Sequence, residues 1–264
     1  MSQTTHSSDK SQRANLQKKR AKRKKQAKQR LLILLFITFT LGFLSGLFVG
    51  SKKEHTLNFV MTPDMPNQES AQTLNLPWNL TLVNFHYSLD KDFTPASLAE
   101  VNNGYEADSR IADAAKNMIA DAAAENVQII TVSAYRDYDY QQELFNNKVH
   151  SLQQEEGYSV DKARAEAATV VAFPGTSEHQ LGLALDLADA NHVVLDESQE
   201  NTTAYQWLKE HCQKYGFIVR YPNGKTDITG IIYEPWHFRY VGEEAAKIIM
   251  EQNITLEEYI ETYY

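Results

Sequence analysis

The run Leu31–Gly50, "LLILLFITFTLGFLSGLFVG", limits most strongly what this 264-residue chain can fold into. Its twenty residues carry no charge and leave no polar face, which disfavours a helix buried in a soluble protein. An apolar helix of this length spans the hydrocarbon core of a bilayer. The run is too long for a secretory signal, and "FVGSKKEH" after it offers no convincing cleavage site. We therefore predict an uncleaved transmembrane anchor.

Charge predicts the orientation of this anchor. Residues 1–30 hold 11 of the 26 Lys and Arg, so the rest of the chain carries 15 basic against 33 acidic residues. Because positive residues beside a span stay in the cytoplasm, we predict a basic cytoplasmic arm over 1–30, the anchor over 31–50 and an extracellular remainder. An acidic folded part disfavours nucleic-acid binding, which needs a basic surface.

The extracellular remainder divides into a linker and one domain. Residues 51–75 are polar, with two prolines and no hydrophobic period, so we predict a stalk over 51–77 and a folded domain over 78–264. Cys212 is the only cysteine, which excludes an internal disulfide. We interpret it as a buried cysteine rather than a nucleophile, since adjacent His211 points elsewhere on a helix.

Hydrophobic periodicity predicts a mixed fold for the domain. Helices are expected over 108–126, 140–152, 160–172 and 202–216, and strands over 78–85, 127–135 and 181–188. Two further strands are expected around a turn at Asn223-Gly224 within 217–236. The tail should form one or two helices, and Thr255 and Glu258 there have capping-box spacing. The elements show no regular βαβ rhythm. This pattern favours an α+β fold with a small, mostly antiparallel sheet flanked by helices.

The predicted strand 181–188 has a side chain that can bind a ligand on one face only. Four leucines at alternate positions, Leu181 to Leu187, share the core face. The opposite face has small residues and Asp186, as expected where a ligand approaches a strand closely. His179 precedes the strand beside two glycines, so its ring can bend over the same face.

A second cluster, Glu234-Pro235-Trp236-His237, supplies what the strand lacks. His179, Asp186 and His237 together give two imidazoles and one carboxylate, the ligand set of a catalytic zinc site with one ion per chain. Glu234 is then a spare carboxylate that can serve as general base. From spacing alone, unrelated surface residues remain the alternative, and Glu234 and His237 reach one site only if the segment turns.

Two motifs carry a family resemblance. "SEHQLGLALD" (177–186) fits Ser-x-His-x-x-Gly-x-Ala-x-Asp, and "EPWHFRYVG" (234–242) fits Glu-x-x-His. With "SAYRDYDYQQELFN" and "GFIVRYP", they make the chain resemble the VanY-type zinc D-alanyl-D-alanine carboxypeptidases, which include related L,D-carboxypeptidases, from about residue 78 to about residue 249. The resemblance implies a Hedgehog/DD-peptidase-like fold, zinc on His179, Asp186 and His237, and Glu234 as the catalytic base.

The resemblance also implies substrate contacts. Arg136, Gln141 and Ser177 match positions that hold the terminal carboxylate or nearby backbone of the substrate, and we expect Tyr221 to line the pocket. An Arg fork suits a terminal carboxylate. Leu181 and Leu185 stand where the family often has Thr and Val, both on the core face.

The expected substrate is a peptidoglycan stem peptide ending in D-alanine. We favour a D,D-carboxypeptidase over an L,D-carboxypeptidase acting on the tetrapeptide, although both substrates end in D-alanine. A non-catalytic wall-binding module would have lost Glu234 or a zinc ligand, and all four are present. An endopeptidase would not need a carboxylate clamp, so Arg136 disfavours it.

Overall fold

The computed structural model describes residues 69–264; the predicted arm, anchor and residues 51–68 of the stalk lie outside the described residues. Its helices are α2 (Ser109–Ala124), α3 (Tyr138–Glu155), α4 (Val160–Ala168), α5 (Thr203–His211), α6 (Thr226–Thr229), α7 (Glu243–Gln252) and α8 (Leu256–Tyr263). Its strands are β1 (Glu69–Ser70), β2 (Tyr87–Ser88), β3 (Leu98–Asn102), β4 (Tyr105–Asp108), β5 (Ile129–Ser133), β6 (Ala184–Asp189), β7 (Phe217–Tyr221) and β8 (Glu234–Tyr240). Within residues 69–264, none of the helices is both long and apolar enough to cross a bilayer.

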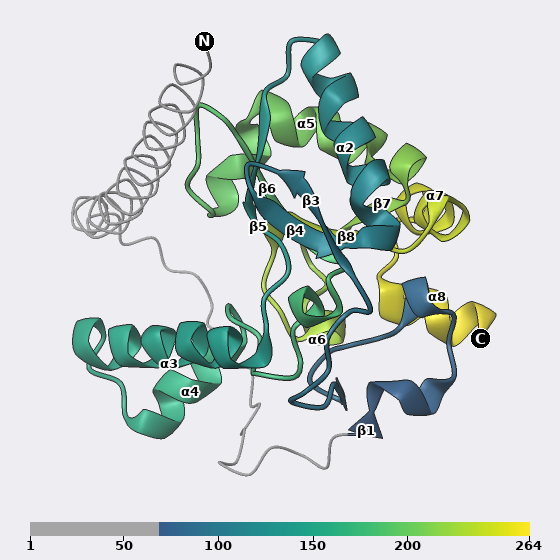
Figure 1. The fold of residues 1–264 in the computed structure, drawn as a ribbon. Helices are drawn as coiled ribbons and strands as arrows, with labels where there is room; N and C mark the ends of the chain where they lie inside the picture. The colour runs from purple at the N-terminus through teal and green to yellow at the C-terminus, as the bar shows by residue number, and fades with distance from the viewer. Residues whose placement is uncertain (1–68) are drawn as a thin grey trace, which may run out of the picture. The chain divides into compact units, whose positions relative to one another are not determined.

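A four-stranded antiparallel sheet in the order β5-β6-β8-β7 forms the centre of the described domain (Figure 1). Two smaller sheets accompany it, the parallel pair β1–β2 and the antiparallel pair β3–β4. Helices surround these sheets without regular alternation. The predicted α+β class with a small, mostly antiparallel sheet is confirmed.

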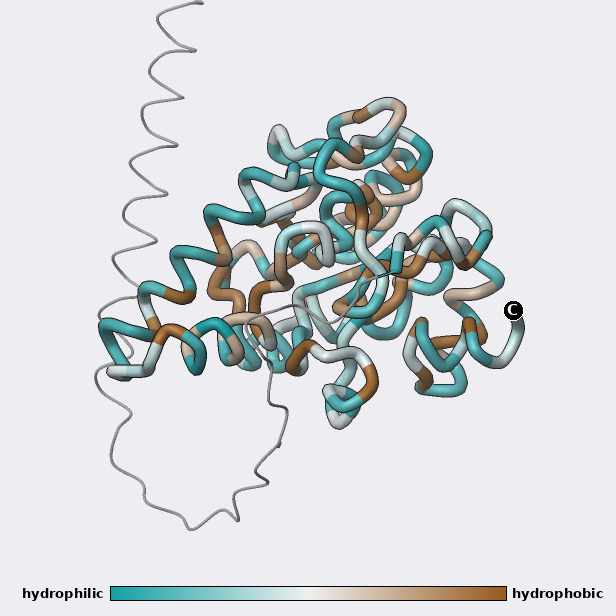
Figure 2. Tube along the Cα trace, turned by 90° about the horizontal axis from the view of Figure 1, so that it is seen from below, coloured by the Kyte–Doolittle hydropathy of each residue, from teal (hydrophilic) through white to brown (hydrophobic). Residues whose placement is uncertain are grey.

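The main core lies between one face of the central sheet and helices α2 and α5. All four leucines of the predicted alternation belong to it, together with Phe217 and Phe238. In Figure 2 the hydrophobic segments lie mostly inside the fold. Cys212 is fully buried in this core, and burial raises the pKa of its thiol to about 12, which confirms its interpretation as a structural residue.

Two satellite clusters lie outside this core. Ile218 of β7 packs with α7 and α8 in one of them. Helices α3 and α4 lie side by side and project from one side of the domain (Figure 1), where Phe145, Val149, Ala163 and Ala167 form the other. The capping box predicted at Thr255 and Glu258 begins α8. The tail is therefore fixed to the domain by its own apolar contacts.

The motif strand begins later than predicted. Residues Glu178–Leu181 form a 3-10 turn, and β6 starts only at Ala184. Between them Gly182 has φ +70°, and a Cβ there would lie 2.8 Å from the backbone nitrogen of Asp108. Only glycine combines this left-handed turn with such close packing. Because of this turn, His179 lies before the strand instead of within it, and its side chain points toward the sheet.

Three further expectations differ from the structure. The predicted strand 78–85 is wrong: Trp78–Leu80 is a 3-10 turn, and the next strand, β2, begins only at Tyr87. The two strands expected within 217–236 exist as β7 and β8, and Asn223-Gly224 forms a turn as predicted, but α6 follows this turn and β8 begins only at Glu234. Residues 69–70 of the predicted stalk pair with β2, and Ala71 packs in the main core. Folded structure therefore begins no later than residue 69.

Candidate metal centre

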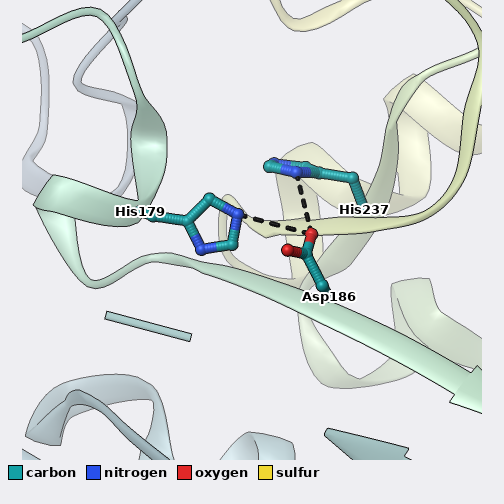
Figure 3. Close-up of side chains that lie close together, drawn as sticks. All are labelled: His179, Asp186 and His237. Carbon is teal, nitrogen blue, oxygen red and sulfur yellow. Dashed lines mark ion pairs between the residues drawn. The ribbon is translucent and has the colours of Figure 1, made fainter. Parts of the chain in front are cut away.

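Three buried side chains from separate segments converge on one point. Asp186 of β6 and His237 of β8 are direct cross-strand partners, and His179 enters from the 3-10 turn (Figure 3). Nε2 of His179 and Nδ1 of His237 each lie 3.3 Å from the same carboxylate oxygen, Oδ1 of Asp186 (Figure 3). The three candidate ligand atoms all lie within 4.8 Å of one another.

The two imidazoles hold their protons on opposite nitrogens. Nδ1 of His179 lies 2.6 Å from the carbonyl oxygen of Ala134. A carbonyl only accepts, so the proton sits on Nδ1 and the lone pair of Nε2 is free. In His237 the arrangement is reversed: Nε2 faces Oε2 of Glu178 at 3.6 Å, which leaves Nδ1 as the free nitrogen. Against the effect of burial, hydrogen bonds to Asp186 and Glu178 raise the pKa of His237 to about 9, so a metal ion must displace a proton from Nδ1 of this ring to bind there.

This geometry fits a zinc ion. Ligand atoms about 2.1 Å from a tetrahedral metal lie about 3.4 Å apart, close to the 3.3 Å between each histidine nitrogen and Oδ1 of Asp186, and all three ligand atoms lie within 4.8 Å of one another. Nε2 of His179 and Oδ1 of Asp186 are buried without a hydrogen-bond partner, a costly state that a cation between them would relieve. Burial and nearby Arg136 also lower the pKa of His179 to about 4, which keeps its imidazole neutral.

Glu234 reaches the same site because β8 is irregular. The pairing of β7 with β8 moves from Val219↔Phe238 to Tyr221↔Glu234, so β8 contains two more residues than β7 between these pairs. Such a bulge re-aims side chains, and it brings Oε2 of Glu234 within 3.6 Å of Nδ1 of His237. Burial, with the nearby Asp186 carboxylate, raises the pKa of Glu234 to about 8.

Two of the four residues expected to contact substrate lie beside these side chains. Nη1 of Arg136 is 3.4 Å from Oδ2 of Asp186 and 3.1 Å from Oγ of Ser133, and its Nε is buried without a partner. The ring of Tyr221 lies 4.8 Å from that of His237, centroid to centroid. We call His179, Asp186, His237, Glu234 and Arg136 the metal-facing cluster.

The other two expected contacts are placed differently. The amide nitrogen of Gln141 donates to the carbonyl of Ala172 at 2.7 Å, while its Oε1 is buried without a partner. Ser177 is buried at the start of the 3-10 turn, two residues before His179. No contact joins either side chain to the ligand atoms, so their predicted roles stay predictions.

Sequence reasoning missed the residues behind the ligands. Oε1 of Glu178 accepts from Nε of Arg220 and from Nη1 of Arg239, both at 2.7 Å, and all three side chains are fully buried. These cations hold the pKa of Glu178 well below its usual range against the effect of burial. A signal existed, because each arginine lies among mostly apolar residues of a strand, in "FIVRY" and "WHFRY".

Two imidazoles and one carboxylate around a common point, with a second carboxylate beside them, define the site of a mononuclear zinc hydrolase. A family model described as VanY, D-alanyl-D-alanine carboxypeptidase, matches residues 105–243, which is more than half of the chain. The chain belongs to this family. A D-alanyl-D-alanine carboxypeptidase of Enterococcus faecalis is 44% identical over 186 residues, covering 70% of this chain and 66% of the relative.

Solved structures agree with this assignment. A structure of VanYB in complex with D-alanine-D-alanine has a TM-score of 0.65 and 41% identity, covering 71% of this chain and all of that one. A VanY mutant in complex with Zn(II) has a TM-score of 0.63 at 41% identity, covering 70% and 99% of the two chains. The L,D-carboxypeptidase LdcB follows at 0.61 and 38%, covering 70% and 87%. The zinc complex and the His–Asp–His set identify Zn²⁺ as the cofactor.

Proposed function

We propose that this protein is a zinc-dependent D-alanyl-D-alanine carboxypeptidase that removes the terminal D-alanine from peptidoglycan stem peptides. The observation that carries the proposal is the convergence of His179, Asp186 and His237, with Glu234 and Arg136 in contact with them. The D-alanine-D-alanine bound in VanYB supports the same substrate end. The family model and the relatives support the reaction class.

Each residue of the site has its own role in the proposed reaction. His179, Asp186 and His237 hold the zinc ion, which when bound acidifies water and polarises the scissile carbonyl. Glu234 accepts the proton of the attacking water and passes it to the amine of the leaving D-alanine. Arg136 pairs with the terminal carboxylate and so places the last peptide bond over Glu234.

Defined muropeptides test this function. The purified full chain is incubated with a pentapeptide stem and with a tetrapeptide stem, with and without a zinc chelator, and the products are weighed by mass spectrometry. We expect loss of one alanine from the pentapeptide only, abolished by the chelator and restored by added zinc. Hydrolysis that survives removal of the metal would overturn the zinc assignment.

An L,D-carboxypeptidase is the second candidate, since LdcB is 38% identical. Both substrates end in D-alanine and differ in the residue before the scissile bond. Loss of alanine from the tetrapeptide alone in the same experiment would replace the first assignment by this one.

We further propose that Leu31–Gly50 is a single-pass anchor, with residues 1–30 in the cytoplasm and the catalytic domain outside the cell membrane. The uncharged run and its basic flank support this topology. The test adds protease to intact protoplasts of cells that make the full chain. We expect the domain to be digested and an epitope placed before residue 30 to survive until the membrane is permeabilised. Protection of the domain would contradict the proposal.

A further inference from the structure

Three fully buried charged side chains, Glu178, Arg220 and Arg239, and the partly buried Glu257 lie behind the metal-facing cluster; we call these four residues the arginine network. Oε1 of Glu178 binds both arginines. The two terminal nitrogens of Arg220, Nη1 and Nη2, donate to Oε2 and Oε1 of Glu257 at 2.9 and 2.6 Å. Two cations and two anions balance, which explains how the three buried charges can be stable in the interior.

Glu257 comes from α8, fourteen residues beyond the end of the family match at residue 243. Asn84 also donates to its Oε1, at 3.1 Å. A continuous series of contacts therefore runs from Glu257 through Arg220 and Glu178 to the ring of His237. The last step joins two buried atoms, Oε2 of Glu178 and Nε2 of His237, which face each other at an ion-pair distance of 3.6 Å and have no partner within hydrogen-bond distance.

We propose that Glu257 is a positioning residue for the metal centre and acts through Arg220 and Glu178. Because Glu257 binds both terminal nitrogens of Arg220, only Nε of that guanidinium is left for Glu178. Glu178 then keeps Oε2 directed at Nε2 of His237, which fixes the ring proton there and leaves Nδ1 for the metal. The inference rests on the proposed role of His237 as a zinc ligand.

Loss of the Glu257 charge should change which carboxylate oxygens the guanidinium of Arg220 binds. In Glu257→Gln the fork of Arg220 keeps only a neutral partner, and Glu178 becomes the remaining carboxylate within its reach. A guanidinium prefers both oxygens of a carboxylate. Arg220 is therefore expected to draw Oε2 of Glu178 away from His237 and to leave the ring without an acceptor for its Nε2 proton.

Cobalt substitution makes this proton visible. In the Co(II)-loaded full chain, the ring N–H signals of both histidine ligands are shifted by the paramagnetic ion and can be followed by NMR. In Glu257→Gln we expect the Nε2 proton of His237 to exchange with solvent faster than in the wild type. The Nδ1 proton of His179, bound to the Ala134 carbonyl, is the internal control and should not change.

Zinc affinity gives a second measurement, by competition with a chromophoric chelator. Loss of a hydrogen-bond partner behind a ligand typically weakens binding about 10- to 100-fold, which we expect for Glu178→Gln, and about tenfold for Glu257→Gln. Glu258→Gln is the matched control: it is the next residue of α8, contacts Lys225 and Thr255, and should bind zinc as the wild type does. In Glu178→Gln, adding Glu257→Gln should cause no further loss.

The outcomes separate the two proposals. If the wild type binds no zinc through His179, Asp186 and His237, the proposed function fails first. If the wild type binds zinc while Glu257→Gln leaves both the exchange of the His237 proton and the affinity unchanged, the positioning role is overturned. Additive losses in the double variant would overturn it too. Should Glu257→Gln fail to fold, Glu257→Asp keeps the charge on a shorter side chain and should give a smaller effect of the same kind.

Discussion

The metal-facing cluster and the arginine network both bury charges against β8, but they differ in how their polar atoms are paired. Every guanidinium nitrogen of Arg220 and Arg239 has an acceptor, including the carbonyls of Asn79, Thr81 and Tyr240. In the arginine network, only Oε2 of Glu178, which faces the ring of His237, lacks a hydrogen-bond partner. In the metal-facing cluster, Nε2 of His179, Oδ1 of Asp186 and Nε of Arg136 all lack one. Because an unpaired buried polar atom costs free energy, such atoms indicate a place kept for a ligand.

This difference predicts two kinds of response to substitution. A change in the metal-facing cluster should mainly alter binding or chemistry. A change in the arginine network should lower that free energy, because it strands a charge in the interior. The four experiments that follow test this division, from the largest expected effect to the smallest.

Glu234→Gln should lower kcat by about 10²- to 10⁴-fold, because the amide cannot accept the proton of the attacking water. The side chain keeps its size, and Glu234 is not one of the three ligands, so zinc content should match the wild type. Steady-state hydrolysis and metal analysis measure the two quantities. A variant that keeps more than about a tenth of the wild-type kcat would remove Glu234 from the role of base.

Arg239→Met should lower the free energy of unfolding by about 3–5 kcal/mol, because it removes one of two cations from fully buried Glu178. Urea unfolding measures this loss. The control is Lys247→Met, which breaks an exposed pair with Glu251 and should change stability by less than about 0.5 kcal/mol. If Arg239→Met lowered the free energy of unfolding no more than the control does, the proposed difference between the two regions would be wrong.

The sequence was sufficient to select three side chains that the structure brings together, and the strand face on which Asp186 lies. The alternating leucines pack in the core as predicted, and Asp186 lies on the other face. A period of two is a local property of a strand, so it can be seen without the fold. Glu234 and His237 are different: three residues apart, they would point to opposite faces of a regular strand. The irregular pairing with β7 brings them together, and pairing between distant strands has no local signal.

Tertiary packing also explains why the strand predicted over 78–85 does not form. "WNLTLVNF" has the composition of a strand, but its leucines, Leu80 and Leu82, pack with α7 and α8 while the backbone begins as a 3-10 turn. Strand propensity reflects burial against neighbours, and here helices from the end of the chain provide that burial. The tautomers of the two imidazoles were likewise beyond prediction, since Ala134 and Glu178 determine them through contacts in space.

Arg136→Lys should raise KM about 10- to 100-fold and change kcat less, because an ammonium cannot make the paired hydrogen bonds of a guanidinium to a terminal carboxylate. Comparing a peptide that has a free carboxyl end with its amidated form isolates this contact. The wild type should strongly prefer the free end, and the variant should lose most of that preference. An unchanged preference would place the carboxylate elsewhere. The free energy of unfolding should stay near that of the wild type.

The smallest effect is the stability of the zinc-free protein as a function of pH. Burial raises the pKa of Glu234 from an ordinary 4.5 to about 8. The folded state then binds this proton more tightly than the unfolded state does, so stability falls as pH rises from about 4.5 to about 8. Glu234→Gln should therefore match the wild type at pH 4 and be more stable than the wild type at pH 8. Glu258→Gln gives the opposite sign, because its hydrogen bond to Lys225 holds the pKa of Glu258 below its ordinary value, and the stability it contributes is present at pH 8 and lost in acid. If both variants shifted in the same direction, burial at the metal-facing cluster would not be the cause.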